Sequence, residues 1–149
     1  MQKLTAFFNM ELSKESAGDL KVGWFFVLEE KTGVVFQHGA TSGLPGYQTR
    51  EHLLVTNRGP IPPTYKYTLD LNGIFSNLKG IEGWSYKIFP HVVPLIGGNR
   101  NGFMLHRDAN VPGTLGCIGL IGTAEEYQPW VEFAKTYRNS RIPLVINYF

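Results

Sequence analysis

A cysteine and a nearby histidine are the pair of side chains in this chain with the clearest capacity for chemistry. Cys117 is the only cysteine in the sequence, and His106 follows a short apolar run. A thiol becomes a strong nucleophile near neutral pH only when a neighbouring base or positive charge favours the thiolate. An imidazole can take the thiol proton and later give it to a leaving group. The pair therefore indicates covalent thiol catalysis, and the alternative interpretation is a buried thiol near an unrelated histidine.

Two glycines and a hydroxyl surround the cysteine. Gly116 and Gly119 permit a tight backbone and a close approach of substrate, and Thr114 places a hydroxyl just upstream. We expect residues 102–106 to form a short strand that ends at the histidine, and residues 115–121 to form another apolar segment. A strand, a loop and a returning strand can bring the thiol beside the imidazole.

The composition is that of one folded domain, which we expect to span residues 1–149. The chain has 43% hydrophobic and 17% charged residues and a net charge of +2, which favours neither disorder nor a nucleic-acid partner. No apolar run approaches the roughly 18 residues of a membrane-spanning helix. One cysteine excludes an internal disulfide and cysteine-rich zinc sites. His38, His52 and His91 lack metal-binding spacing, so the sequence predicts no metal and no cofactor.

The elements that must position these residues are mostly strands. Glycine and proline divide the chain into short segments rich in β-branched and aromatic residues, a pattern typical of β-structure. A turn is expected at residues 97–102. Expected strands are residues 3–10, 23–29, 34–38, 53–55, 65–69, 84–93 with a break at Pro90, 102–106, 115–121 and 142–149.

One segment near the C-terminus predicts a helix. Thr123 and Glu126 have the spacing of a capping box, in which the threonine accepts from the third helical N–H and the glutamate bonds back. Apolar residues then recur at helical spacing, and we expect Pro129 to kink or restart the helix. The sequence thus predicts a mainly β single domain with one principal α-helix.

The segment that contains His106 and Cys117 resembles the signature of a known family. His106, the loop after it, Thr114-Leu-Gly-Cys117 and Ile118 are similar to the signature of the L,D-transpeptidase catalytic domain, also called the YkuD domain. The stretch "RGPIPPTYKYTL" (residues 58–69) resembles a segment of a branch that includes secreted antibacterial effectors and phage-borne members. The stretch "TSGLPG" (residues 41–46) fits the loop before it. The resemblance covers residues 34–120 and implies a β-sandwich or mixed sheet.

The resemblance implies acyl transfer or hydrolysis on peptidoglycan stem peptides. In that family the cysteine attacks the amide after the third residue of a stem tetrapeptide, D-alanine leaves, and a thioester forms. An amine then gives a 3→3 crosslink, water gives carboxypeptidase activity, and another amide gives exchange or cleavage. Cys117 would be the nucleophile and His106 the base, with backbone N–H groups of Gly116 and Cys117 stabilising the oxyanion.

The resemblance leaves the surrounding contacts open. Thr114 is expected to bond within the site, and the partner that orients His106 is either a backbone carbonyl or Asp108. Many relatives carry histidine at the position of Leu115 and arginine or asparagine at that of Gly119, and such a polar residue can bind a substrate carboxylate. Arg107 and Arg100 are the candidate replacements.

These departures favour a hydrolytic or carboxypeptidase role over crosslinking. Two alternatives remain: a non-catalytic wall-binding or virion module with the same fold, and a lytic cysteine peptidase. The apolar stretch at residues 4–8 is shorter than the roughly 7–15 residues of a secretory signal core. We therefore expect synthesis in the cytoplasm and action in the periplasm or cell wall after non-classical export, lysis or injection.

Overall fold

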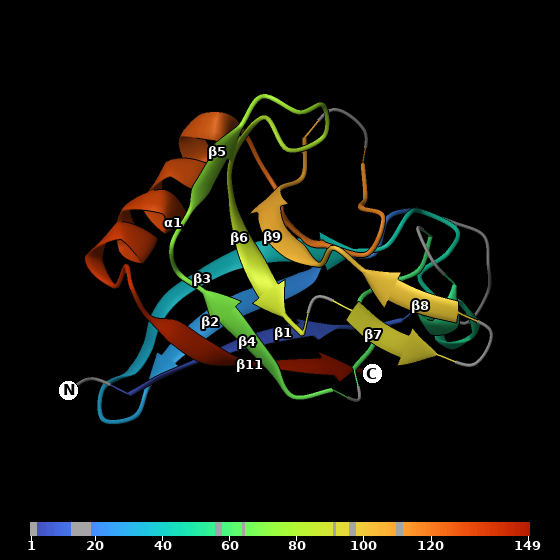
Figure 1. The fold of residues 1–149 in the computed structure, drawn as a ribbon, viewed down its shortest axis with the longest axis horizontal. Helices are drawn as coiled ribbons and strands as arrows, with labels where there is room; N and C mark the ends of the chain where they lie inside the picture. Colours follow the sequence, from blue (N-terminus) through green and yellow to red (C-terminus); the bar gives the residue numbers. More distant parts are fainter. Residues whose placement is uncertain are drawn as a thin grey trace.

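The computed structural model describes residues 3–12, 19–55, 58–63, 65–90, 92–95, 98–109 and 112–149 (Figure 1). Strands dominate these residues, and α1 is the α-helix among them. The elements in chain order are β1 Leu4–Met10, β2 Gly23–Glu29, β3 Gly33–Ser42, the 3₁₀-helix η1 Arg50–Leu54, β4 Tyr67–Asp70, β5 Ile74–Ser76, β6 Gly83–Phe89, β7 Val92–Leu95, β8 Gly98–Asn101, β9 Met104–Arg107, β10 Ile118–Leu120, α1 Ala124–Thr136 and β11 Arg141–Tyr148.

The main sheet closes on itself. Its strand order is β4-β11-β1-β2-β3-β10-β9-β6-β5, and β4 also pairs with β6. The strands from β4 round to β6 therefore form a barrel of eight, which differs from the expected sandwich. The pairs β1–β11 and β9–β10 are parallel and the others antiparallel, so the expected mixed sheet is confirmed. Closure leaves β5 as an outlying strand on β6, and β7 and β8 form a separate hairpin.

Along several strands, every second side chain is buried, and these buried side chains fill the barrel. In β1 every second residue is buried, so Ala6 and Phe8 face the interior while Phe7 lies on the outer side. Trp130 of α1 is 0% exposed and packs edge-on against Phe25 and Tyr86, at centroid distances of 5.1 and 5.4 Å. These aromatic contacts hold α1 against the sheet (Figure 1).

The predicted helix start is confirmed. Thr123 Oγ1 accepts from the Glu126 N–H at 3.1 Å, and the Glu126 carboxylate accepts from the Thr123 N–H at 3.0 Å. The predicted restart of the helix at Pro129 is wrong, because α1 runs continuously through that residue. The hydroxyl of Tyr127 donates to the Trp84 carbonyl at 2.8 Å, which ties α1 to β6.

Several expected elements differ in the structure. The predicted strand at residues 53–55 is wrong: a 3₁₀ turn forms there, closed by hydrogen bonds from His52 N–H to Thr49 O and from Val55 N–H to His52 O. The segment 84–93 is interrupted at Pro90 as predicted, and its parts belong to β6 and β7. In the predicted turn at 97–102, Gly98–Asn101 is instead a strand paired with β7, and residue 97 lies outside the described residues. Strand β5 was not predicted.

Candidate functional site

The parallel pair β9–β10 brings His106 and Cys117 together. Ile118 lies opposite Leu105 and Gly119 opposite His106, so Cys117, just before β10, is level with Met104. Met104 and His106 are two residues apart in one strand and share a face. The thiol and the imidazole therefore lie over the same face of two adjacent strands, as the sequence predicted.

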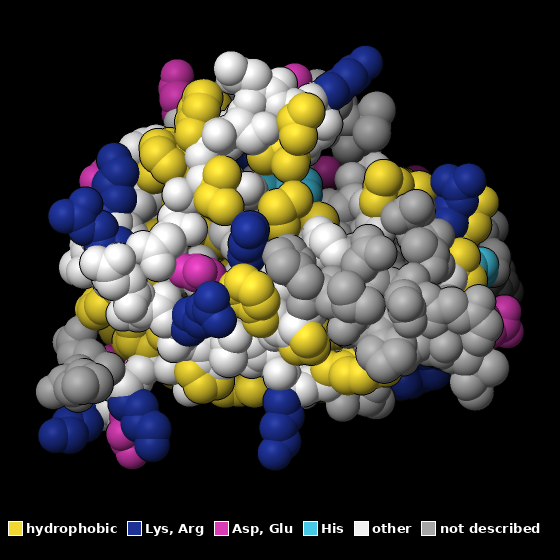
Figure 2. All heavy atoms as spheres, in the orientation of Figure 1, with side chains coloured by type: hydrophobic (Ala, Val, Ile, Leu, Met, Phe, Trp, Pro, Cys, Tyr) yellow, Lys and Arg dark blue, Asp and Glu magenta, His cyan; other side chains and the backbone are white. Residues whose placement is uncertain are grey.

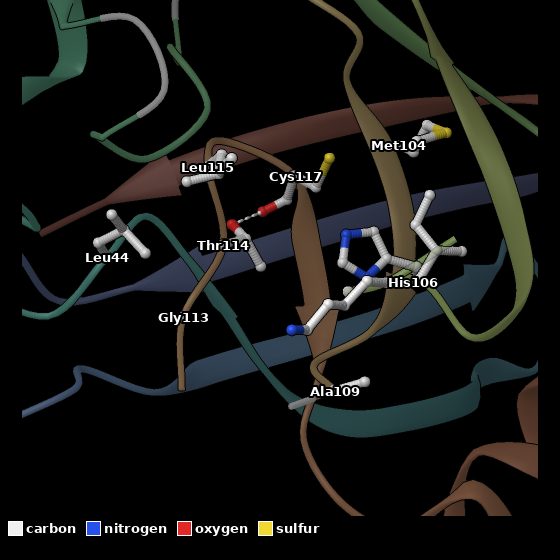
Figure 3. A pocket seen from close by; sticks show the side chains of 11 residues that line it. Leu44, Met104, His106, Ala109, Gly113, Thr114, Leu115 and Cys117 are labelled. Atoms are coloured by element: carbon white, nitrogen blue, oxygen red, sulfur yellow. Dashed lines mark hydrogen bonds between the residues drawn. The ribbon is translucent and has the colours of Figure 1, made fainter. Parts of the chain in front are cut away.

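Both side chains open into one cavity of about 390 Å³. Its volume lies in the range of roughly 300–1,000 Å³ that is usual for small-ligand sites. Figure 3 shows Cys117, Thr114 and His106 next to one another in this cavity. Its lining residues are Leu44, Lys79, Gly80, Ile81, Met104, His106, Ala109, Gly113, Thr114, Leu115 and Cys117.

The imidazole of His106 is fixed in the form that a base requires. Its Nδ1 lies 2.7 Å from the carbonyl oxygen of Arg107, which can only accept, so Nδ1 carries the proton and Nε2 is the accepting nitrogen. His106 is 8% exposed, and burial lowers its pKa below the usual value, although the bond to Arg107 opposes this shift. The ring is therefore neutral at pH 7. Of the two orienting partners that the sequence left open, the structure has the backbone carbonyl.

The thiol of Cys117 is partly exposed and donates to the Gly102 carbonyl at 3.6 Å. A thiol is a weak donor, so little is lost when it exchanges this acceptor for another. Rotation about the Cα–Cβ bond of Cys117 sweeps the sulfur through the cavity that His106 also lines. The arrangement thus places the Cys117 thiol and a neutral imidazole at one cavity.

The hydroxyl of Thr114 holds the loop that presents the thiol. It donates to the Cys117 carbonyl at 2.5 Å and accepts from the N–H groups of Gly43 at 3.1 Å and Gly116 at 3.3 Å. Thr114 is buried, and its own N–H donates to the Gly43 carbonyl. The observed bonds of Thr114 are to the protein backbone, and its expected role in substrate or oxyanion binding stays a prediction. Because the Gly116 N–H points to this hydroxyl, an oxyanion role for Gly116 requires that this long bond be exchanged for one to substrate.

The two upstream segments quoted for the family resemblance meet the cysteine loop in space. Ser42 donates through its hydroxyl to the Gly116 carbonyl at 3.3 Å and accepts from the Ile61 N–H at 2.9 Å. The Leu44 N–H donates to the Arg58 carbonyl at 2.9 Å. The side chain of Ser42 therefore links the proline-rich segment to Gly116, the residue before Cys117.

The side chains of Arg107 and Asp108 form hydrogen bonds to backbone groups near the cavity. Neither residue is among the described residues that line the cavity. Arg107 donates to the Gly122 carbonyl at 3.4 Å. Asp108 accepts from the Gly113 N–H at 2.9 Å, and burial raises the pKa of its carboxyl against the opposing effects of that bond and of Arg107. The other candidate carboxylate ligand, Arg100, has a side chain outside the described residues.

Leu115 and Gly119 are the two positions that depart from the family pattern, and the structure shows what surrounds each. Leu115 is 57% exposed at the cavity, where it adds an apolar wall. A side chain cannot be added at Gly119 without rearrangement, because its Cβ would lie 2.9 Å from Thr114 Cγ2 and 3.0 Å from Asp108 Cβ. The glycine is thus required by the close packing of Thr114 and Asp108.

Sequence reasoning missed the contribution of the loop between β5 and β6. Lys79, Gly80 and Ile81 line the cavity from this loop, far along the chain from the dyad. Nothing in their spacing or composition signals a site, and β5 itself was not predicted. The long-range pairing of β6 with β9 brings this loop to the cavity. In Figure 2 hydrophobic side chains gather in the upper part of the face, near this loop, while Lys and Arg side chains are scattered.

Removal of the Thr114 hydroxyl tests its role as the organiser of the loop. Thr114→Val keeps the shape but leaves the Gly43 and Gly116 N–H groups without their acceptor, which is expected to lower the free energy of unfolding by about 1–3 kcal/mol. Urea denaturation measures this loss. Thr114→Ser retains the hydroxyl and is expected to stay within about 1 kcal/mol of the wild type. Equal stability of the valine variant and the wild type would contradict the role.

The buried neutral imidazole predicts a pH dependence of stability. Because the folded pKa of His106 lies below its unfolded value of about 6.5, the unfolded chain binds more protons between these two values, and stability falls as pH drops through that window. His106→Gln lacks this contribution. The difference in free energy of unfolding between wild type and variant, measured in urea, is expected to shift against the wild type between pH 7.5 and pH 5. A pH-independent difference would show that burial does not suppress protonation of His106.

Comparison with known proteins gives no relative: no family model, no curated protein and no solved structure matches this chain. Within the described residues, no three His, Cys, Asp or Glu side chains are grouped in a way that could hold a metal ion. The same residues contain no helix with the length and apolarity needed to cross a bilayer. A functional interpretation therefore rests on the cavity and on the residues that line it.

Proposed function

We propose that this chain is a cysteine-dependent acyltransferase or hydrolase of the L,D-transpeptidase type that acts on peptidoglycan stem peptides. The observation that carries the proposal is the shared cavity: Cys117 and His106 open into it from adjacent strands, and His106 has its Nδ1 tied to a carbonyl. A thiol beside a neutral, oriented imidazole is the arrangement that nucleophilic catalysis by cysteine requires.

The proposed reaction begins with transfer of the Cys117 proton to Nε2 of His106. The sulfur attacks the carbonyl carbon of the scissile amide, and the oxygen that gains the charge is stabilised by backbone N–H groups at Cys117 and Gly116. The imidazolium then gives its proton to the leaving amine as the C–N bond breaks, which leaves a thioester on Cys117. Water or a second amine, deprotonated by His106, attacks the thioester and releases the thiol.

The assignment to stem peptides has further support in how the chain folds around the site. The segments 41–46 and 58–69, on which the family resemblance depends, are bonded to the cysteine loop through Ser42 and Thr114. The mainly β class with one helix near the C-terminus is the coarse fold class that the resemblance implies, although the sheet closes into a barrel and not a sandwich. A site for such peptides implies action at a bacterial cell wall, in the periplasm or outside it.

A non-catalytic wall-binding module is the second candidate. The observation that favours it is the hydrogen bond from the Cys117 thiol to the Gly102 carbonyl, because a donating thiol is protonated and poorly nucleophilic. In this case the cavity would bind a stem peptide without breaking it. The two candidates differ in whether Cys117 is required for a change in the ligand.

Purified protein incubated with tetrapeptide muropeptides tests the proposal. We expect tripeptides, 3→3 dimers or exchange products by liquid chromatography and mass spectrometry. Cys117→Ala is expected to abolish them, and His106→Ala to slow them by about 10²–10⁴-fold, the usual contribution of a general base. Equal product formation by Cys117→Ala would overturn the mechanism. Unchanged muropeptides together with wall binding that survives Cys117→Ala would establish the binding module instead.

A further inference from the structure

The wall of the cavity formed by the β5–β6 loop is not used by the dyad. The Leu78 carbonyl accepts from the N–H groups of Ile81 at 3.1 Å and Glu82 at 3.0 Å, which closes a tight turn. Gly80 lies within this turn at a φ of +93°, a conformation that favours glycine. The turn places Lys79 and Ile81, on either side of Gly80, at the cavity that Cys117 lines.

Lys79 gives the cavity its charge. Of the eleven described residues that line the cavity, Lys79 is the one with an ionised side chain at neutral pH, since the imidazole of His106 is neutral there. The rest of the lining is largely apolar, with Leu44, Ile81 and Met104 among it. Charge attraction is stronger beside such a lining than in open water. The cavity therefore favours a ligand that carries a negative group.

The ammonium of Lys79 is available for such a group. The ion pairs found among the described residues join Glu132 to Lys135 and Asp70 to Arg141, and neither involves Lys79. Lys79 is exposed, so it stands where the cavity meets solvent. A lysine on a flexible stem can follow a carboxylate over a range of positions.

We propose that Lys79 is a specificity-determining residue that binds the free terminal carboxylate of the residue released from the acyl donor. This inference rests on the proposed function. The acyl carbon must reach the Cys117 sulfur, and the cavity volume of about 390 Å³ is at the lower end for a ligand site. Because Cys117 and Lys79 line the same small cavity, a peptide whose acyl carbon lies at the Cys117 sulfur has its next residue within reach of Lys79. The released residue must also leave through the solvent side, where Lys79 lies.

This assignment restricts which bond the site breaks. When the residue beyond the scissile amide has no acidic side chain, a carboxylate at that distance exists only at a chain end, so the preferred donor of this kind is a peptide with one residue to lose. A longer or amidated peptide presents a neutral group to Lys79, so the charge attraction between the ammonium and a terminal carboxylate is lost. The chain would thus remove or exchange terminal residues in preference to cutting inside a peptide.

A matched pair of substrates tests this assignment. The stem tetrapeptide with a free C-terminal carboxylate is compared with the same peptide as its C-terminal amide, in the wild type and in Lys79→Ala, Lys79→Arg and Lys79→Glu. We expect kcat/KM of the wild type to favour the acid by about tenfold, the usual weight of one charge-assisted hydrogen bond. Lys79→Ala is expected to remove that preference while turnover of the amide is retained. Lys79→Arg is expected to keep the preference, and Lys79→Glu to reverse it.

Lys31→Ala is the control, because it makes the same change in net charge at an exposed residue in the β2–β3 turn that does not line the cavity. It is expected to leave the preference intact. Loss of activity of equal size on both peptides in Lys79→Ala would overturn the assignment, since it would show a general effect on the thiol. An unchanged acid preference in Lys79→Ala would overturn it as well.

Calorimetric titration separates failure of this inference from failure of the proposed function. Cys117→Ala protein, which cannot form a thioester, is titrated with both peptides with and without Lys79→Ala. Tighter binding of the acid that depends on Lys79 supports the assignment even if the wild type turns over neither peptide. Equal binding of the acid and the amide, or no binding of either, overturns it. Turnover of both peptides at one rate would leave the thiol chemistry standing and remove only the role of Lys79.

Discussion

The parallel pairing of β9 with β10 determines where chemistry can occur in this chain. It sets Cys117 level with Met104 and puts His106 on the same face, so two residues separated by a loop become neighbours at one cavity. The same pairing places β10 between β9 and β3, so the loop before β10 meets the end of β3. Displacement of either strand would separate the Cys117 thiol from the His106 imidazole.

The loop between these strands is held by backbone bonds to a few buried hydroxyls. Thr114 bonds to three backbone groups at once, and Ser42 joins the residue before the cysteine to the segment at Ile61. Buried polar groups are costly unless they are paired, so a network that is fully paired favours one arrangement of the loop. Close packing at Gly119, which leaves no room for a side chain, adds to this constraint. The position of the thiol thus depends on packing far from it in sequence.

Much of the local structure could be predicted from the sequence because the signals are local. The capping box at Thr123 and the alternating burial of β1 arise from neighbours within a few residues. The pairing of Cys117 with His106 was also predictable, since one loop separates their segments. The missed strand β5 depends on a long-range contact, because it exists only against β6. The missed η1 is a local 3₁₀ turn, which forms where a short apolar run favoured a strand. Lys79 reaches the cavity only because β6 pairs with β9, which is distant in the sequence.

The proposed reaction requires that Cys117 form a covalent acyl intermediate with a stem peptide. Intact-protein mass spectrometry after rapid acid quenching of protein mixed with excess stem tetrapeptide measures this directly. We expect an added mass equal to the acyl tripeptide, located on the peptide that contains Cys117. Conversion of the tetrapeptide without any adduct on Cys117, or an adduct located at another residue, would contradict it.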